Sequence, residues 1–469
     1  MPAAREKEIF ESRSVSRAVW ELALPTMIGQ IILVIYNMAD TFFIGMTGSD
    51  AMLTAVTVCM PGFLFLSAIA NLFGVGGGSA IARALGSGER ERVGRAASFS
   101  LWGCVAAAAV YAGGVFVFRE EFVDLLGGGD PAVHPLAAEY LLWTVAAGGI
   151  ASAAGMLLSH LIRAEGRALH ASVGIALGGV LNIALDPLFM FVLLPPGRET
   201  LGAALATALS NGVSLLYFTG VLLAIRQKSQ LSFRFSACIL KEGIPREIFA
   251  AGLPACVMTL LENVSYAVLD RQMACAGIQL QAGIGVAKKV NMLAHCMVRG
   301  VAQGSLPLSA YNYAAGSLSR MEEAGRAARR VAVGVAAVCT AAGLLLSREL
   351  VGIFIRRESD SLLYGAAFLR ILCLGAPLSA SAYIGISFFQ AVGEGRRSFL
   401  LAVLRKGVID IPLMFLLSAF FPVFGLVAAT PAADGICCVA AAVLQQRYIK
   451  KLSFSHRPMG RRGVRTTAA

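Results

Sequence analysis

Two carboxylates lie inside long apolar stretches of the chain, where a charge is costly. Asp40 lies near the far end of the run 20–45, which contains neither Lys nor Arg and is long enough to span a bilayer as one helix of about 20 residues. Asp186 lies in the apolar segment GVLNIALDPLF, residues 179–189. A charged residue within a spanning helix costs about 2.5–3.5 kcal/mol on insertion scales and is usually functional. The alternatives are an interfacial helix end for Asp40 and an ordinary turn before Pro187 for Asp186.

Further polar residues could join these carboxylates. Asn182 precedes Asp186 by four residues, so both share one helix face, and Pro187 predicts a bend that frees a backbone carbonyl nearby. At a rise of 1.5 Å per residue, Asp40, Asp186 and Thr207 lie roughly 8, 13 and 9 Å from the outer ends of their helices. We therefore expect a proton or cation site in the outer part of one lobe. Two carboxylates close together would let one of them hold a proton near neutral pH.

The second half of the chain has intramembrane charges of its own. Glu262 follows Pro254 by eight residues, roughly 12 Å from the outer end of its helix, and Lys288 and Lys289 lie roughly 14 Å into the next one. An ion pair between Glu262 and either lysine would explain how these charges are tolerated. The pair could take part in transport or be purely structural. Arg299 is expected to extend toward the cytoplasmic surface, with no role in the site.

Composition places the chain among polytopic membrane proteins. Of 469 residues, 57% are hydrophobic and 14% charged, against about 25% charged residues in soluble proteins. The ten cysteines are scattered and the five histidines isolated, so neither a disulfide framework nor a metal site is indicated. No nucleotide-binding loop occurs, and we expect no cofactor and no enzyme activity. The net charge of +12 is typical of basic cytoplasmic loops rather than of nucleic-acid binding. The glycines at 74 and 76–78 predict close helix packing.

The apolar segments predict an all-α polytopic membrane protein with twelve transmembrane helices. The expected spans are 18–45, 51–82, 96–118, 133–159, 169–195, 201–225, 247–270, 279–309, 327–347, 362–391, 398–421 and 425–447. Most Lys and Arg residues lie in the N-terminus, in the loops after even-numbered spans and in the C-terminus. By the positive-inside rule both termini are then cytoplasmic. The first span is expected to be retained rather than cleaved as a signal peptide, and the expected location is the cell membrane.

An internal repeat divides the chain into halves. Leu24-Pro25 recurs as Leu253-Pro254, ALG at 84–86 aligns with AAG at 314–316, EGR at 165–167 recurs at 394–396, and GAALAT at 202–207 recurs as GLVAAT at 425–430. Six spans per copy give both halves the same orientation, as in transporters with a site between two repeats. The expected units are an N-terminal six-helix lobe at 1–226, a cytoplasmic linker at 227–246, a C-terminal six-helix lobe at 247–447 and a basic tail at 448–469. The two lobes would be related by pseudo-twofold symmetry.

Over about residues 15–450, the chain resembles the MATE family, the multidrug and toxic compound extrusion transporters. The stretches that carry the resemblance are 25–45 with Asp40, ALGSG at 84–88, residues 163–166, NIALDPLF with GAALAT behind it, PLSAYNYAAG at 307–316, QAVGEGR at 390–396, and Arg405. The resemblance implies a two-lobe antiporter that exports organic, often cationic, compounds in exchange for H⁺ or Na⁺. The lobes would rock about the linker, so that a central cavity opens alternately to each side, and the family suggests a monomer.

The resemblance also assigns roles to residues. The family's N-lobe cation site, which could hold Na⁺, carries over to Asp40, Asn182 and Asp186, with Thr207 beside them. Pro25 corresponds to the kink proline and would act as a hinge. Some sodium-coupled members pair an acidic residue equivalent to Glu262 with another in the tenth span. The segment 362–391 has no acidic residue, which favours proton coupling or an ion site in the N-lobe. The residues expected to line the cavity are Tyr36, Asn37 and Met190.

A second hypothesis remains at this point. Related superfamily members move lipids or lipid-linked oligosaccharides across the bilayer, and such a cavity needs cations for phosphate groups. Lys288, Lys289 and Arg299 would then have to face the cavity. A receptor or an intramembrane enzyme is disfavoured, because the sequence shows no ligand-binding ectodomain and no catalytic constellation.

Overall fold

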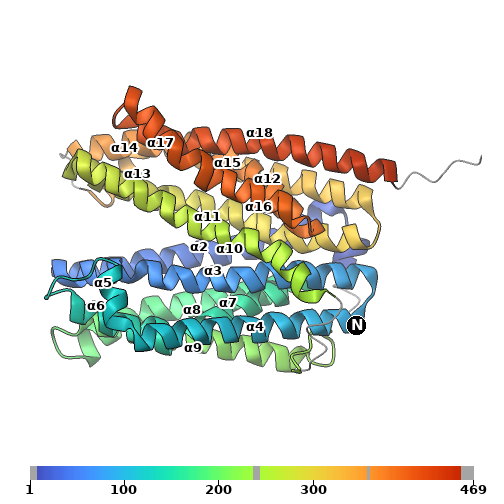
Figure 1. The fold of residues 1–469 in the computed structure, drawn as a ribbon, viewed down its shortest axis with the longest axis horizontal. Coiled ribbons are helices and arrows are strands. Elements are labelled where there is room, and N and C mark those ends of the chain that lie inside the picture. Colours follow the sequence, from blue (N-terminus) through green and yellow to red (C-terminus); the bar gives the residue numbers. More distant parts are fainter. Residues whose placement is uncertain (1–7, 236–242, 356–359, 456–469) are drawn as a thin grey trace, which may run out of the picture.

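The computed structural model describes residues 8–235, 243–355 and 360–455. The described chain is almost entirely helical and forms two bundles that lie side by side (Figure 1). The first bundle, here the N-lobe, contains α2 (Val15–Met46), α3 (Asp50–Ser87), α4 (Arg90–Val117), α5 (Arg119–Leu125), α6 (His134–Leu141), the π-helical turn η1 (Leu142–Ala147), α7 (Gly149–Ala164), α8 (Ala168–Leu188), the π-helical turn η2 (Phe189–Leu193) and α9 (Glu199–Ile225).

The second bundle, here the C-lobe, repeats this order. It contains α10 (Ile244–Ala276), α11 (Ile278–Ala314), α12 (Leu318–Leu345), α13 (Ser347–Gly352), α14 (Asp360–Leu374), α15 (Ala376–Val392), α16 (Gly395–Val403), the π-helical turn η4 (Leu404–Ile409), α17 (Asp410–Phe420) and α18 (Phe424–Ser455). The expected linker is described except for residues 236–242. The expected tail begins inside α18, and residues 456–469 lie outside the described part of the chain.

Most of the expected spans satisfy simple membrane criteria. Within the described ranges, eight helices are long and apolar enough to cross a bilayer, and two bent pairs bring the number to ten. These pairs are α6–η1 with α7, bent by 47°, and α14 with α15, bent by 42°. The expected total of twelve adds α11 and the run α16–η4–α17. Both are helical but rich in internal charge, with Lys288, Lys289 and Arg299 on the first and Arg405, Lys406 and Asp410 on the second. The all-α, two-lobe fold class is confirmed.

The glycine-rich part of α3 allows two close helix contacts. A Cβ atom on Gly76 would lie 2.2 Å from the backbone oxygen of Ile248 on α10, and one on Gly77 would lie 2.1 Å from Oγ of Ser100 on α4. Real Cβ contacts are never that short, so only glycine fits. The packing role predicted for these glycines is confirmed. Gly76 lies where α3 of the N-lobe contacts α10 of the C-lobe.

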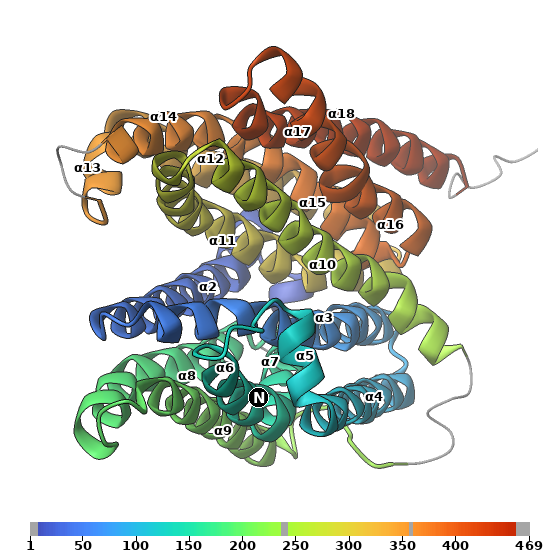
Figure 2. The ribbon, with the colours of Figure 1, turned by 60° about the vertical axis from the view of Figure 1, so that its left-hand side comes forward.

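The lobes meet mainly through α3 with α10 and α2 with α11, which lie against each other in Figure 2. Polar contacts cluster where α2 begins and α18 ends, here the terminal side. Ser79 Oγ donates to the backbone oxygen of Gln390 (2.6 Å), and Arg92 Nη2 pairs with Glu247 Oε1 (2.6 Å). The contacts therefore hold the two lobes together on this side.

The segment before α2 belongs by sequence to the N-lobe but packs under the C-lobe. Phe10 stacks on Tyr311 of α11, with ring centroids 4.8 Å apart. Tyr311 also donates its hydroxyl hydrogen to Glu11, and Arg320 of α12 donates to the backbone oxygen of Phe10 (2.7 Å). The segment adds a second connection between the lobes on the terminal side.

Candidate functional site

Three of the predicted site residues form one hydrogen-bonded group in the N-lobe. Asn182 and Asp186 lie on α8, and Thr207 lies on α9. Asn182 Nδ2 donates to Asp186 Oδ1 (3.1 Å) and approaches Thr207 Oγ1 (3.3 Å). All three side chains are buried, and Asp186 is fully so. The expected proximity of these residues is confirmed.

Asp40 reaches the same group from α2. The helices α2 and α8 pack closely because Gly179 has no side chain, and a Cβ there would lie 2.9 Å from Ile32 and 3.2 Å from Tyr36. Asp40 is buried and close enough to Asp186 for their charges to repel each other. The four residues Asp40, Asn182, Asp186 and Thr207 are called the N-lobe cluster below.

Two tyrosines flank the N-lobe cluster. Tyr36 lies one helical turn before Asp40 on α2, as the sequence suggested, and is half-buried rather than open. Tyr140, on α6, is also within electrostatic range of both Asp40 and Asp186. Tyr140 had no signal in the sequence, because α6 is distant in the chain and only the folded lobe brings it to the carboxylates.

The N-lobe cluster has more acceptors than donors. Asp40 Oδ1, Asn182 Oδ1 and Asp186 Oδ2 are buried and have no hydrogen-bond partner among the described residues. A buried acceptor without a donor costs about 1–3 kcal/mol, and carboxylate and amide oxygens accept protons or bind hard cations. The arrangement is therefore suited to a proton shared by the carboxylates or to a small cation held by these oxygens.

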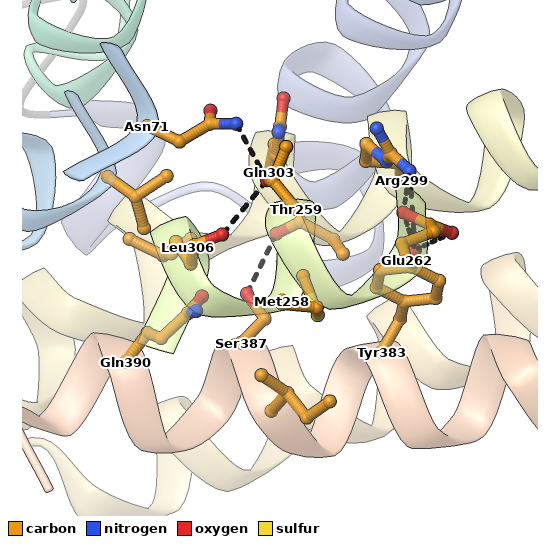
Figure 3. A pocket seen from close by; sticks show the side chains of 14 residues that line it. Asn71, Met258, Thr259, Glu262, Arg299, Gln303, Leu306, Tyr383, Ser387 and Gln390 are labelled. Carbon is orange, nitrogen blue, oxygen red and sulfur yellow. Dashed lines mark hydrogen bonds and ion pairs between the residues drawn. The ribbon is translucent and has the colours of Figure 1, made fainter. Parts of the chain in front are cut away.

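A second polar group lies in a pocket between the lobes (Figure 3). Glu262 of α10 accepts a hydrogen bond from Arg299 Nη2 of α11 (2.8 Å) and another from the hydroxyl of Tyr383 on α15 (3.2 Å). Asn71 of α3 donates to Thr259 on α10 (3.1 Å) across the lobe boundary. The pocket has an interior volume of about 40 Å³, and one water needs roughly 10–15 Å³. In this conformation it has room for a few waters but not for a drug-sized molecule.

The partner predicted for Glu262 was wrong. Lys288 pairs instead with Asp270, and Lys289 is exposed. Arg299, expected to extend to the surface, points inward to Glu262. The reason is geometric: side chains of an α-helix lean toward its N-terminus, so Arg299 leans back along α11 to the level of Glu262. Asp270, nearer the turn between α10 and α11, takes Lys288.

Other expectations about single residues have mixed outcomes. Asn37 donates to the backbone oxygen of Leu33 (2.7 Å) and, among the described residues, makes no hydrogen bond to the N-lobe cluster. Met190 does not line a cavity: it is buried inside the N-lobe, where Gly202 lets α9 approach its backbone. Pro25 lies within the unbroken helix α2. Pro187 does not end α8, but the helix changes to the π-helical turn η2 two residues later.

A buried charge network in the C-lobe was not predicted. Its charged members are Arg405, Lys406, Asp410 and Asp434, all nearly or fully buried. Arg405 Nε pairs with Asp434 Oδ1 (2.6 Å), and Lys406 Nζ pairs with Asp410 Oδ2 (3.0 Å). The internal repeat held the missing signal, because the offset that aligns GAALAT with GLVAAT also brings Asp186 close to Asp410.

An apolar cleft lies between α2 of the N-lobe and α11 of the C-lobe. It is formed by α2 and α11, together with Phe354 after α13, and encloses about 490 Å³. Ile35, Met38 and Phe42 line it from α2, and Leu293 and Met297 line it from α11. The helix that carries Asp40 thus also forms one wall of this cleft.

Comparison with known proteins decides the family. The MatE family model matches residues 25–188 and matches again at residues 254–416. The chain belongs to the MatE family. The two matches begin 229 residues apart, the offset between Pro25 and Pro254, so the duplication inferred from short motifs extends over most of both lobes.

Members of the family resemble the chain over nearly its whole length. The multidrug export protein MepA of Staphylococcus saprophyticus is 28% identical over 437 residues, 93% of this chain and 94% of the relative. MepA of Staphylococcus aureus is 27% identical over 435 residues, again 93% and 94%. The crystal structure of a MATE in complex with MaD3S matches with a TM-score of 0.88 at 23% identity, over 95% of this chain and 98% of the other. An outward-facing multidrug resistance MATE transporter of the MOP superfamily matches with a TM-score of 0.85 at 24% identity, over 94% of this chain and 97% of the other. The fold is that of a multi-pass MATE transporter.

Proposed function

We propose that this MatE-family protein is a secondary active antiporter. It exports organic, often cationic, drugs or toxic compounds in exchange for H⁺ or Na⁺ by alternating access. The observation that carries the proposal is the set of three buried acceptor oxygens in the N-lobe cluster, which belong to Asp40, Asn182 and Asp186 and lack donors among the described residues. The similarity to multidrug export proteins supports the same function.

The coupling step is a change of charge on α2 and α8. When Asp40 and Asp186 are both ionised they repel each other in a buried environment, and binding of H⁺ or Na⁺ removes this repulsion. Asp40 is on the same helix as the cleft residues Ile35, Met38 and Phe42, so a movement of α2 changes the cleft directly. Pro25, lower on α2, is the proposed hinge.

The apolar cleft is the proposed binding place for the organic substrate. Its volume of about 490 Å³ falls within the range of about 300–1,000 Å³ of small-molecule sites. Apolar walls, and a buried carboxylate, Asp40, on one of the helices that form them, suit an amphiphilic cation. Ion uptake by the carboxylates weakens the attraction for that cation, which couples ion entry to substrate release.

The lipid-flippase hypothesis receives less support from the charges. It requires free cationic side chains for phosphate groups. Arg299 does face the pocket between the lobes, but Glu262 balances its charge, and Asp270 balances that of Lys288. The described residues that line the apolar cleft are all apolar. We therefore favour an organic-cation substrate. The proposed location is the cell membrane, with a monomeric protein and both termini cytoplasmic.

Gradient-driven efflux from proteoliposomes tests the proposal. Efflux of a fluorescent organic cation is followed with a pH gradient and a sodium gradient imposed separately, for wild type, Asp40→Asn, Asp186→Asn and the double variant. We expect the double variant to lose efflux driven by the coupling ion. Asp50→Asn, which removes an exposed carboxylate in the first turn of α3, is the matched control and should retain it.

Ion-driven export that survives in the double variant would contradict the coupling role of the N-lobe cluster. Absence of gradient-driven flux in correctly inserted wild type would contradict antiport itself. A labelled-lipid scrambling assay on the same vesicles would then test the flippase function.

A further inference from the structure

The C-lobe contains a second copy of the N-lobe cluster. Asn182, Asp186 and Thr207 align with Lys406, Asp410 and Thr430 at offsets of 224, 224 and 223 residues. The copy is also built alike. Its first two members are again four residues apart in a helical run that includes a π-helical turn, and its threonine again lies at the end of a GxxxAT motif in the following helix.

The contacts inside the copy follow the same plan. Lys406 Nζ pairs with Asp410 Oδ2 (3.0 Å), as Asn182 bonds Asp186 in the N-lobe. Thr430 Oγ1 donates to Asp410 Oδ1 (3.1 Å), and Ser265 Oγ, from α10, donates to Asp410 Oδ2 (2.7 Å). Both oxygens of Asp410 thus have donors, whereas Asp186 Oδ2 has none among the described residues.

The two copies differ in charge. The N-lobe cluster has two carboxylates, Asp40 and Asp186, and an amide at 182. In the C-lobe the position of Asp40 is taken by Leu269, which is buried, and the amide is replaced by the ammonium of Lys406. The neighbouring Arg405 does not alter this balance, because Asp434 pairs with it. With its carboxylates ionised, the N-lobe cluster therefore carries two uncompensated negative charges, whereas the C-lobe copy is neutral by itself.

We propose that the ammonium of Lys406 is a tethered counterion that permanently takes the place of the transported cation in the C-lobe copy. Lys406 is nearly fully buried, with the ring of Tyr266 at 5.4 Å, so it cannot leave the site as a free ion does. H⁺ or Na⁺ then binds in the N-lobe copy alone. The inference rests on the proposed antiport, and it adds that Lys406→Asn opens a second cation site of the same chemistry.

Cation binding by the purified full-length protein tests this inference. Binding of radioactive sodium is measured at equilibrium, and protonated carboxyl groups are detected by their carbonyl band in infrared difference spectra. The variants are Asp186→Asn, Lys406→Asn, Asp410→Asn and Asp186→Asn with Lys406→Asn. We expect wild type to bind one cation, Asp186→Asn none and Asp410→Asn one. The Lys406→Asn variant gains a site, and this site persists when Asp186→Asn is added.

Two results of this experiment would overturn the inference and leave the proposed antiport standing. One is a folded double variant, with an unchanged melting temperature, that neither binds sodium nor shows a protonated carboxyl group. The other is loss of the cation of wild type on Asp410→Asn, which would make the C-lobe copy the working site. If the Asp186→Asn variant instead binds as much cation as wild type, the proposed antiport is refuted, and this inference with it.

A reciprocal variant covers the case in which Lys406→Asn does not fold. Asn182→Lys should place an ammonium beside Asp186, as Lys406 is placed beside Asp410. We expect its melting temperature to be independent of sodium, and at least equal to that of cation-saturated wild type. A melting temperature below that of cation-free wild type would contradict the equivalence of the two copies.

Discussion

At the scale of single residues, the N-lobe cluster depends on one donor. Asn182 directs its Nδ2 group to both Asp186 and Thr207, which fixes the side chain and leaves its own Oδ1 available as an acceptor. An amide held in this way presents an oxygen next to two carboxylate oxygens. The hydroxyl of Thr207 therefore acts on the cation site through the orientation of Asn182.

Thr207→Val should weaken cation binding without abolishing it. The change leaves one amide hydrogen of Asn182 without its acceptor, a loss of about 1 kcal/mol, or roughly five- to tenfold in the coupling-ion concentration that gives half-maximal efflux. Ser210→Ala is the matched control, because Ser210 lies one turn further on α9 and donates only to its own helix (2.7 Å). Equal effects of the two changes would show that Thr207 has only a packing role.

Glu262→Gln should destabilise the C-lobe. Removal of one partner from a fully buried ion pair costs about 3–5 kcal/mol. Since the side chain of Arg299 is 32% exposed, we expect only about 1–2 kcal/mol, by the same reasoning. The second change Arg299→Met should recover part of this loss. Unfolding of the single and double variants in detergent measures the coupling, and strictly additive losses would contradict a direct pair.

At the scale of elements, close helix contacts depend on glycine at a few positions. A Cβ atom on Gly252 of α10 would lie 1.8 Å from the backbone oxygen of Leu72 on α3. Backbone atoms cannot rotate away, so a side chain at this position forces the two helices, and with them the two lobes, apart.

Gly252→Ala should shift the protein away from the conformation described here. We expect longer distances between spin labels on the terminal ends of the two lobes, together with slower export. Gly334→Ala on α12 is the control, because nothing lies within 4 Å of its Cβ position. That change should leave the distances as they are and stabilise the helix by up to about 1 kcal/mol.

A buried carboxylate outside the membrane spans, Glu165, binds the start of the inter-lobe linker. Glu165, at the end of α7, accepts hydrogen bonds from the Ser229 hydroxyl (2.8 Å) and the Gln230 backbone N–H (2.8 Å). Burial raises the pKa of Glu165 above its ordinary value, although these hydrogen bonds oppose the shift. With a raised pKa, the stabilising contribution of protonated Glu165 is fully present below the unfolded-state pKa. It is lost as pH rises through the folded-state pKa.

Glu165→Gln should remove this pH dependence. The amide keeps an acceptor oxygen for the Gln230 N–H but carries no charge. We therefore expect the variant to match or exceed the melting temperature of wild type at about pH 8, and to lose its advantage at about pH 4, where the carboxyl group is largely protonated. Glu165→Ala, which removes the acceptor, should be less stable than Glu165→Gln at both pH values. A larger advantage of the amide in acid would contradict this account.

At the scale of the whole molecule, contacts on the terminal side join the lobes. Besides the backbone contacts at Gly76 and Gly252, the ion pair of Arg92 with Glu247 connects α4 to α10 (2.6 Å). Both side chains are partly exposed, so the pair contributes at most about 1 kcal/mol. Alternating access requires these contacts to break in every cycle, and weak polar contacts suit that purpose.

Glu247→Gln should therefore favour opening of the terminal side by up to about fivefold, the equilibrium equivalent of 1 kcal/mol. Spin-label distance distributions across the two lobes measure the population. Glu91→Gln is the matched control, because Glu91 pairs with Arg95 within α4 (2.8 Å) and does not join the lobes through that pair. Indistinguishable distributions for both variants would contradict a role of the Glu247 contact in closing this side.

Much of this architecture could be predicted from the sequence. The length and polarity of the apolar runs indicate spanning helices, and motifs repeated in order indicate two similar lobes. The contact of Asn182, Asp186 and Thr207 was also within reach, because four-residue spacing on a helix fixes a shared face and the helix that carries Thr207 follows directly. These features depend on local periodicity and short connections, which a sequence displays directly.

Only the tertiary structure decided which charged side chains pair with each other. Glu262 pairs with Arg299 rather than with a lysine. Side chains on α11 point toward the N-terminus of the helix, so depth counted along the backbone gives the wrong partner. Packing between distant helices brings Tyr140 within electrostatic range of the carboxylates and buries Met190 in the core. Asp410 is neutralised by Lys406 whereas Asp186 has an oxygen without a donor among the described residues. That difference depends on which side chains the fold brings to each copy of the same motif, and it separates a cation site from a structural ion pair.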